Sequence, residues 1–93
     1  MPPADAPIPA VPGIVPFGDD AVLADLREPA GIRAARRAQA LASAIEALRQ
    51  GDPRLGAPVP GAASVLVPFD PSGIDTAGMA ALLAPLLAAL PDD

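Results

Sequence analysis

Residues 60–75 read PGAASVLVPFDPSGID, and they contain the clearest predicted strand of this 93-residue chain. The run SVLVPF, residues 64–69, is apolar and rich in β-branched side chains, which favours a strand. Pro-Gly before the run and Asp-Pro-Ser-Gly after it are turn signals. Pro68 lies inside the run and has no N–H to donate to a β-ladder, so we expect this strand to lie at a sheet edge or to carry a bulge there.

Two amphipathic helices are predicted, one before and one after this strand. Residues 31–50 carry apolar side chains at alternating spacings of four and three, and Gly51 ends the pattern. Asp75 or Thr76 caps the second helix, which Pro85 is expected to kink or split. The predicted buried stripes are Ala34, Ala38, Leu41, Ile45 and Leu48 in the first helix, and Met79, Leu82, Leu83, Leu86, Leu87 and Leu90 in the second.

A strand–turn–strand hairpin is predicted before the first helix. The apolar run that Gly18 closes predicts one strand, and Pro16 within it indicates an edge or a bulge. The next strand alternates, with Val22, Ala24 and Leu26 on one face. A glycine turn followed by a strand and a helix occurs here and again from Gly61 onward, which suggests an internal repeat.

Sliding the chain by 43 positions places Gly18 on Gly61, Val22 on Val65, Leu23 on Leu66 and Leu26 on Phe69. A helix follows in both halves. The sequence therefore predicts a single α+β domain over residues 13–91, in two layers, with an antiparallel sheet of about four strands and two helices on one face. This β-β-α unit, repeated, leaves the other face of the sheet open to a partner.

Composition excludes several classes of function. The chain has no Cys, His, Lys, Trp or Tyr, which removes the usual zinc ligands, the commonest general base and most stacking residues of single-strand nucleic-acid binders. The net charge of −5 argues against nucleic-acid binding. No uncharged run reaches the roughly 20 apolar residues of a membrane span, and no signal-peptide pattern is visible. We expect a cytoplasmic protein that binds no nucleic acid, membrane, metal or cofactor.

No catalytic residue is predicted. Ser43, Ser64 and Ser72 have no His or Lys to activate them. Residues 1–12 are rich in Pro and Ala, which is typical of a disordered, mobile tail, or of a docking peptide for an aromatic groove.

Arg33, Arg36 and Arg37 form the one local cationic patch of the sequence. They form either a solvated helix face or a contact for an acidic surface of a protein partner, since guanidinium groups pair well with carboxylates. Cations in the first turns of a helix oppose the helix dipole, which favours an external reason for them. The second helix carries no charge, and we expect either an exposed Ala-rich surface or burial on both sides by a partner.

Two motifs resemble a known family. The first matches at Pro16, Gly18, Asp19 and Ala21, and the second at Val59, Pro60, Gly61, Ser64, Val67, Phe69, Asp70 and Pro71. In this order they resemble the N-terminal domain of the Kip inhibitor/5-oxoprolinase family, also called allophanate hydrolase subunit 1. That family forms the first half of the carboxyltransferase module in urea carboxylase. The resemblance covers roughly residues 14–90.

The resemblance implies a two-layer domain with a repeated β-β-α unit and a protein partner, either a cyclophilin-like barrel or a carboxyltransferase subunit. The family's catalytic positions lie largely in that barrel and in the partner subunit, and the 93 residues hold no counterpart of the barrel. Three functions follow from the resemblance. They are a non-catalytic subunit that completes a 5-oxoprolinase-like or urea carboxylase-type assembly, a regulatory module of the sensor-kinase-inhibitor type, and a structural subunit of a carboxylase complex.

Overall fold

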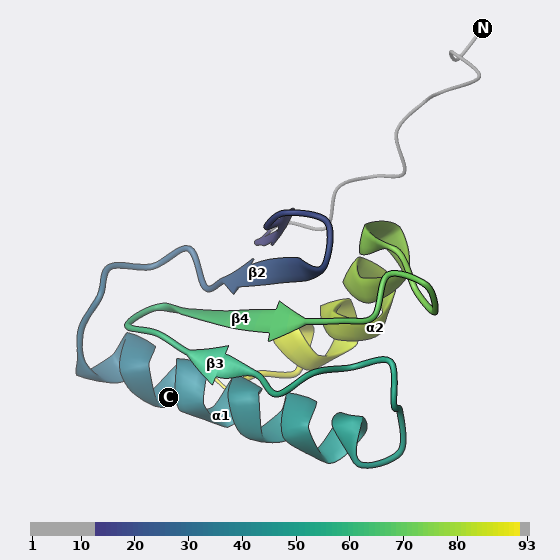
Figure 1. Ribbon diagram of the computed structural model, residues 1–93. Coiled ribbons are helices and arrows are strands. Elements are labelled where there is room, and N and C mark those ends of the chain that lie inside the picture. Colours follow the sequence, from purple (N-terminus) through teal and green to yellow (C-terminus); the bar gives the residue numbers. More distant parts are fainter. Residues whose placement is uncertain (1–12, 92–93) are drawn as a thin grey trace, which may run out of the picture.

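The computed structural model describes residues 13–91, in which two β-β-α units follow one another and share one sheet (Figure 1). The strand order is β1-β2-β4-β3, all antiparallel, so that the second strand of each unit lies at the centre. The predicted α+β fold class is confirmed, whereas the tail predicted for residues 1–12 lies outside the described residues. In chain order the elements are β1 (Ile14–Pro16), β2 (Ala21–Asp25), α1 (Ile32–Arg49), β3 (Val59–Pro60), β4 (Ser64–Pro68) and α2 (Thr76–Ala88).

The central strands bury one face because apolar side chains occupy every second position. Val22 and Ala24 of β2 lie opposite Val67 and Val65 of β4, and all four are almost completely buried. Their neighbours along each strand point to the other face. This alternation confirms the predicted face of the first hairpin.

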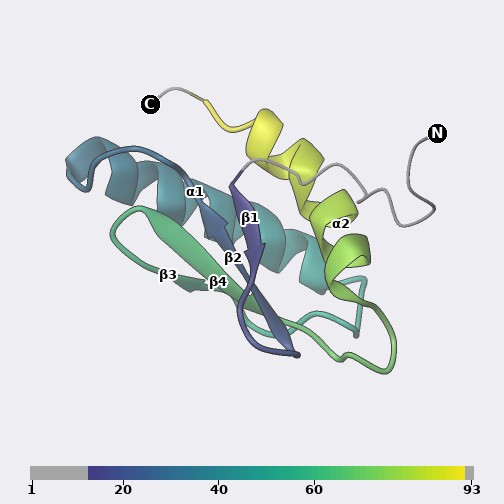
Figure 2. The same cartoon turned by 90° about the horizontal axis from the view of Figure 1, so that it is seen from above.

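Both helices pack on that buried face, as the view from above shows (Figure 2). α1 contacts β3 and β4, and α2 contacts β1 and β2. Asp75 caps α2 by accepting a hydrogen bond from the Gly78 N–H at 2.7 Å, and α2 runs unbroken through Pro85, so the predicted split does not occur. Neither helix of the described chain is long and apolar enough to cross a bilayer.

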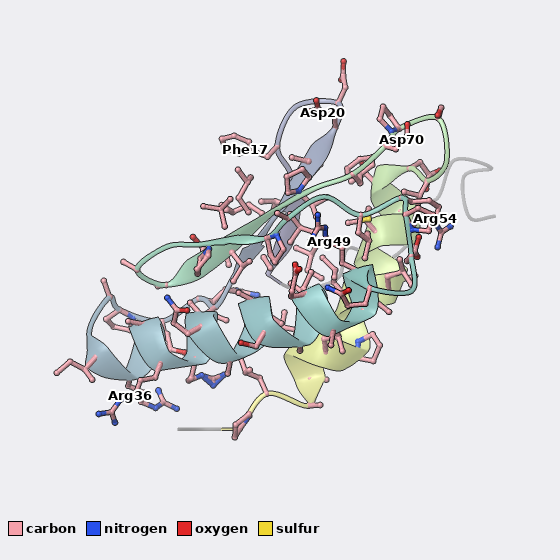
Figure 3. All side chains as sticks on the ribbon, turned by 60° about the horizontal axis from the view of Figure 1, so that its bottom comes forward. Phe17, Asp20, Arg36, Arg49, Arg54 and Asp70 are labelled. Carbon is pink, nitrogen blue, oxygen red and sulfur yellow. The ribbon has the colours of Figure 1, made fainter. Side chains whose placement is uncertain are left out.

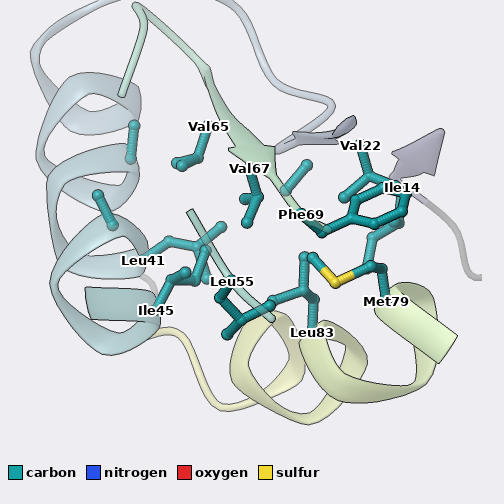
Figure 4. Packing of buried hydrophobic residues seen from close by; sticks show 13 residues of the cluster. Ile14, Val22, Leu41, Ile45, Leu55, Val65, Val67, Phe69, Met79 and Leu83 are labelled. Atoms are coloured by element: carbon teal, nitrogen blue, oxygen red, sulfur yellow. The ribbon is translucent and has the colours of Figure 1, made fainter. Parts of the chain in front are cut away.

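The core lies where the two helical stripes meet the sheet (Figure 4). The predicted stripe of α1 is buried apart from Leu48, which is partly exposed, while only two residues of the predicted α2 stripe are fully buried. The side chains at its centre are Val22, Leu41, Ile45, Val65, Val67, Met79 and Leu83.

Pro68 lies in β4, a central strand, so the predicted edge position is wrong. The Phe69 N–H donates to the Asp20 carbonyl at 2.8 Å, which places Phe69 in a hydrogen-bonded pair with β2. Because such pairs alternate along an antiparallel ladder, the Pro68 nitrogen faces away from β2 and toward β3.

The β3 side of β4 carries the bulge that was the other expectation for Pro68. Between the Val59–Leu66 pair and the isolated Leu55–Phe69 bridge, the outer chain advances by four residues while β4 advances by three. This extra residue interrupts the ladder where the Pro68 nitrogen points, so no donor is missed. The Pro68 carbonyl is still used, because it accepts the Gly56 N–H at 2.8 Å.

The two edge strands also contain proline. Pro16 lies in β1 and Pro60 in β3, and the edge position predicted for Pro16 is confirmed. The hydrogen bonds Phe17 N–H to Ala21 O and Gly61 N–H to Ser64 O show which residues bond inward. By alternation, Pro16 and Pro60 both occupy positions that point outward from the sheet.

The internal repeat is visible in the sheet. A shift by 43 positions carries β2 onto β4, and the equivalent residues Leu23 and Leu66 lie directly opposite each other. Gly13 and Gly56 are equivalent under the same shift, and both approach the neighbouring strand closely. A Cβ atom would lie 2.6 Å from the Asp25 carbonyl oxygen at Gly13, and 2.9 Å from the Pro68 Cβ at Gly56.

We predict that Leu41→Ala lowers the free energy of unfolding by about 2–5 kcal/mol, because it leaves a cavity between α1 and the sheet. Urea denaturation followed by circular dichroism measures this change. Gln39→Ala, at an exposed position of the same helix, is the matched control and should change stability by about 0.5 kcal/mol or less. Equal effects of the two variants would contradict the described packing of α1.

Candidate functional site

The sheet face that points away from the helices carries a row of four apolar side chains, one from each strand. Val15 lies opposite Leu23, Leu23 opposite Leu66, and Leu66 opposite Val59. Residues directly opposite each other share a face, and these four alternate with the buried residues of their strands. We call Val15, Leu23, Leu66 and Val59 the apolar row.

Phe17 extends the apolar row toward the β1–β2 hairpin. Its N–H donates to the Ala21 carbonyl at 2.9 Å, so it lies opposite Ala21 and beside the row. Within residues 13–91 four large apolar side chains are exposed, and three of them are Val15 (45%), Phe17 (56%) and Val59 (55%) on this face. The fourth, Ile32, begins α1. The apolar row and Phe17 together form the open face.

The open face has carboxylates at one end. Asp19 and Asp20 lie in the β1–β2 hairpin and Asp70 directly follows β4, and all three are exposed. The hydrogen bond from Phe69 N–H to Asp20 O holds the two segments side by side. Figure 3 shows Phe17, Asp20 and Asp70 on the side of the molecule opposite Arg36. We call Asp19, Asp20 and Asp70 the acidic rim.

The Asp70 carboxylate is stabilised in its charged form. Its Oδ1 accepts hydrogen bonds from the Ser72 hydroxyl at 2.7 Å and from the Ser72 N–H at 3.0 Å. These two bonds, the hydroxyl first, lower the pKa of Asp70. The rim therefore keeps a negative charge at this position down to acid pH.

The predicted cationic patch is divided by Glu28, a residue that the sequence interpretation missed. Arg33 Nη1 lies 3.0 Å from Glu28 Oε2, and Arg37 Nε lies 3.0 Å from Glu28 Oε1. The Arg37 Nε–H is buried and not aligned for a hydrogen bond, so this contact is an ion pair alone. Arg37 Nη1 also donates to the Pro91 carbonyl at 3.1 Å, which ties α1 to the chain after α2.

Arg36 differs from its two neighbours. It is exposed and makes no ion pair with another residue of the described range 13–91 (Figure 3). Arg33 and Arg37 thus contribute to holding the loop before α1, and Arg36 is the member of the patch that points to solvent. A partner contact through Arg33, Arg36 and Arg37 stays a prediction.

A bidentate ion pair stabilises the loop before β3. Arg54 Nε donates to Asp52 Oδ1 at 2.8 Å and Arg54 Nη2 to Asp52 Oδ2 at 2.7 Å. These hydrogen bonds lower the pKa of Asp52 from 3.8 to about 2 and raise the pKa of Arg54. The Arg54 carbonyl accepts the Asp70 N–H at 2.8 Å, so the pair also holds the loop that carries the acidic rim.

This arrangement suits binding and offers little for catalysis. No group of three or more metal-ligating side chains gathers anywhere in residues 13–91. The open face was only partly predicted: an uncovered sheet face was expected, but its apolar row was not. The signal was present in Leu23 and Leu66, which are apolar at positions where a solvated face usually carries polar residues.

A protein-family model described as carboxyltransferase domain, subdomain C and D, matches residues 12–93. Neither a curated protein nor a solved structure matches the chain. The matched range includes both β-β-α units, and therefore every strand that contributes to the open face.

We predict that the Asp52 carboxyl titrates near pH 2, which NMR of the side-chain carboxyl carbon measures directly. Because its pKa is lowered by folding, the stability that Asp52 adds is complete above about pH 4 and is lost as the pH falls through about 2. Arg54→Gln should return the pKa toward 3.8, whereas Arg49→Gln, which removes a pair elsewhere, should leave it unchanged. A midpoint near 3.8 in the unaltered protein would refute the ion pair.

Proposed function

Because the chain belongs to the carboxyltransferase subdomain C and D family, we propose that it is a non-catalytic module of a carboxyltransferase-type assembly and joins that assembly through its open face. Partner subunits supply the amide or carboxyl-transfer chemistry. The resemblance of the two sequence motifs favours an assembly of the 5-oxoprolinase-like or urea carboxylase type. In that case the partner is a cyclophilin-like barrel or a carboxyltransferase subunit.

The observation that carries this proposal is the apolar row. An antiparallel sheet with one solvated face usually alternates apolar and polar residues, yet here the outward positions of all four strands are apolar. Burial of a Val, Leu or Phe side chain contributes roughly 1.5–3 kcal/mol. Contiguous exposed apolar surface of this kind marks a binding site.

The dimensions of the row limit what can cover it. Four strands at a spacing of about 4.8 Å carry the row across roughly 14 Å of the sheet. An α-helix with its side chains is about 10–12 Å wide. A single helix laid along the strands is therefore too narrow for the row, and the partner has to present two helices or a sheet.

The serines support a role without catalysis. Ser72 is the only serine with a carboxylate contact among the described hydrogen bonds, and that carboxylate is Asp70. A lowered pKa makes Asp70 a weaker base, so it is poorly suited to activate the Ser72 hydroxyl at neutral pH. His and Lys, the usual activating groups, are absent from the whole sequence.

Two other functions use the same surface. A regulatory module of the sensor-kinase-inhibitor type would bind a kinase through the open face, since burial of apolar surface needs no chemistry. A structural subunit of a carboxylase complex would bind in the same way but leave the activity of the complex unchanged when removed. The identity of the partner and the activity of the depleted complex separate these alternatives.

We predict that the tagged chain, purified from its native host, retains a carboxyltransferase-type protein that mass spectrometry identifies. Val59→Asp should reduce the recovered partner by about tenfold or more, because a charge in an apolar contact costs more than the 1.4 kcal/mol that a factor of ten represents. Val59 lies on a two-residue edge strand and is half-exposed, so the fold should tolerate the change.

The matched control is Ile32→Asp, which places the same charge on an exposed apolar residue away from the open face. It should leave recovery unchanged, and circular dichroism should show both variants folded. Recovery of a histidine kinase would support the regulatory alternative. Recovery of neither class of protein, or equal loss with the two variants, would refute the proposed function.

A further inference from the structure

The charges of the described chain are not evenly compensated. Within residues 13–91, ion pairs engage Glu28, Glu46 and Asp52, each with at least one arginine. The Asp25 and Asp75 carboxylates accept backbone N–H groups of Arg27 and Gly78. The acidic rim is different, because no cationic side chain of the described residues pairs with Asp19, Asp20 or Asp70.

The acidic rim and the apolar row meet at Phe17. Phe17 precedes Asp19 by two residues and lies opposite Ala21, while Asp70 follows the last residue of the neighbouring strand segment. Figure 3 shows Phe17, Asp20 and Asp70 at this end of the sheet. At the other end of the strands, Asp25 stands two residues from Arg27, so the charges there offset each other.

We propose that the surface which covers the open face is a protein surface with an apolar centre and a group of Arg or Lys residues at one end, seated on the acidic rim. The docking itself rests on the proposed function, and the inference adds the chemistry of the partner. Phe17 acts as the aromatic anchor beside the charge pairs, the position in which interface residues contribute most to binding.

A second copy of the chain is the less favourable occupant. Each chain carries a net charge of −5, so two copies repel each other over distances of about 8–10 Å at physiological salt. A face-to-face pair with its strands in the same direction would place one acidic rim against the other. A partner with a basic end turns the same charges into attraction.

The two parts of the surface have different kinetic roles. Exposed charges at the edge of an interface act mainly on the association rate and its salt dependence. Burial of Phe17 and the apolar row acts mainly on the dissociation rate. The rim therefore sets the orientation in which the partner arrives, and the row holds it.

The experiment replaces Phe17 with the photo-crosslinking amino acid p-benzoylphenylalanine in the full chain, expressed in the native host. Crosslinked peptides are identified by mass spectrometry. We expect a peptide of another protein that carries two or more Arg or Lys residues near the crosslinked position. The same crosslinker at Gln39, exposed on α1, is the control and should give little of this product.

Charge reversal then tests the rim. Asp20→Lys should lower the yield of the Phe17 crosslink by about tenfold at low salt, whereas Glu46→Lys, with the same change of charge on α1, should lower it by less than about twofold. Glu46 lies in an exposed pair with Arg49, so its replacement should disturb the fold little. Circular dichroism checks both variants.

Several outcomes would overturn the inference. They are a crosslink to a second copy of the chain, a partner peptide without basic residues, no crosslink from Phe17, or equal effects of Asp20→Lys and Glu46→Lys. The proposed function fails separately. If the partner has a basic end but is not a carboxyltransferase-type protein, the function is refuted and the inference stands; if the partner is of that type and Asp20→Lys has no special effect, the reverse holds.

Discussion

The pairing of β2 with β4 is the constraint on which both the core and the binding surface depend. It is the one contact that joins the two β-β-α units within the sheet, and its register places Val22 and Ala24 beside Val67 and Val65 over the helices. A slip of one residue would turn these side chains toward solvent and bring the outward residues inside. The small core therefore specifies the register, and the register in turn aligns the apolar row across all four strands.

Much of the fold could be predicted because its signals are local. The helical stripes, the Asp75 cap and the strand after Gly61 each depend on a few neighbouring residues, and all three appear in the structure. The strand order depends on distant pairing, and this is where prediction failed. Pro68 seemed to need a sheet edge because the two-residue strand β3, which covers that side of β4, has almost no signal of its own.

The candidate site was harder to predict than the fold, for a similar reason. Glu28 approaches Arg33 and Arg37 from a loop, at spacings that no helical or strand period predicts. The apolar row becomes a surface only when four separate strands are placed side by side in the right register. Composition excluded catalytic and nucleic-acid functions well, since a missing residue type needs no geometry to interpret, but it could not show where the remaining carboxylates gather.

The outward-pointing prolines have a consequence for how this protein associates. An exposed edge strand normally offers a line of free N–H and C=O groups, which invites strand addition, domain swapping and growth into fibrils. Pro16 on β1 and Pro60 on β3 each delete a donor from such a line, and β3 is in addition only two residues long. Both edges thus resist extension of the sheet into a polymer. A chain with so much exposed apolar surface is in this way kept as a discrete unit, and its contacts are confined to the face, where side chains and not the backbone decide what binds.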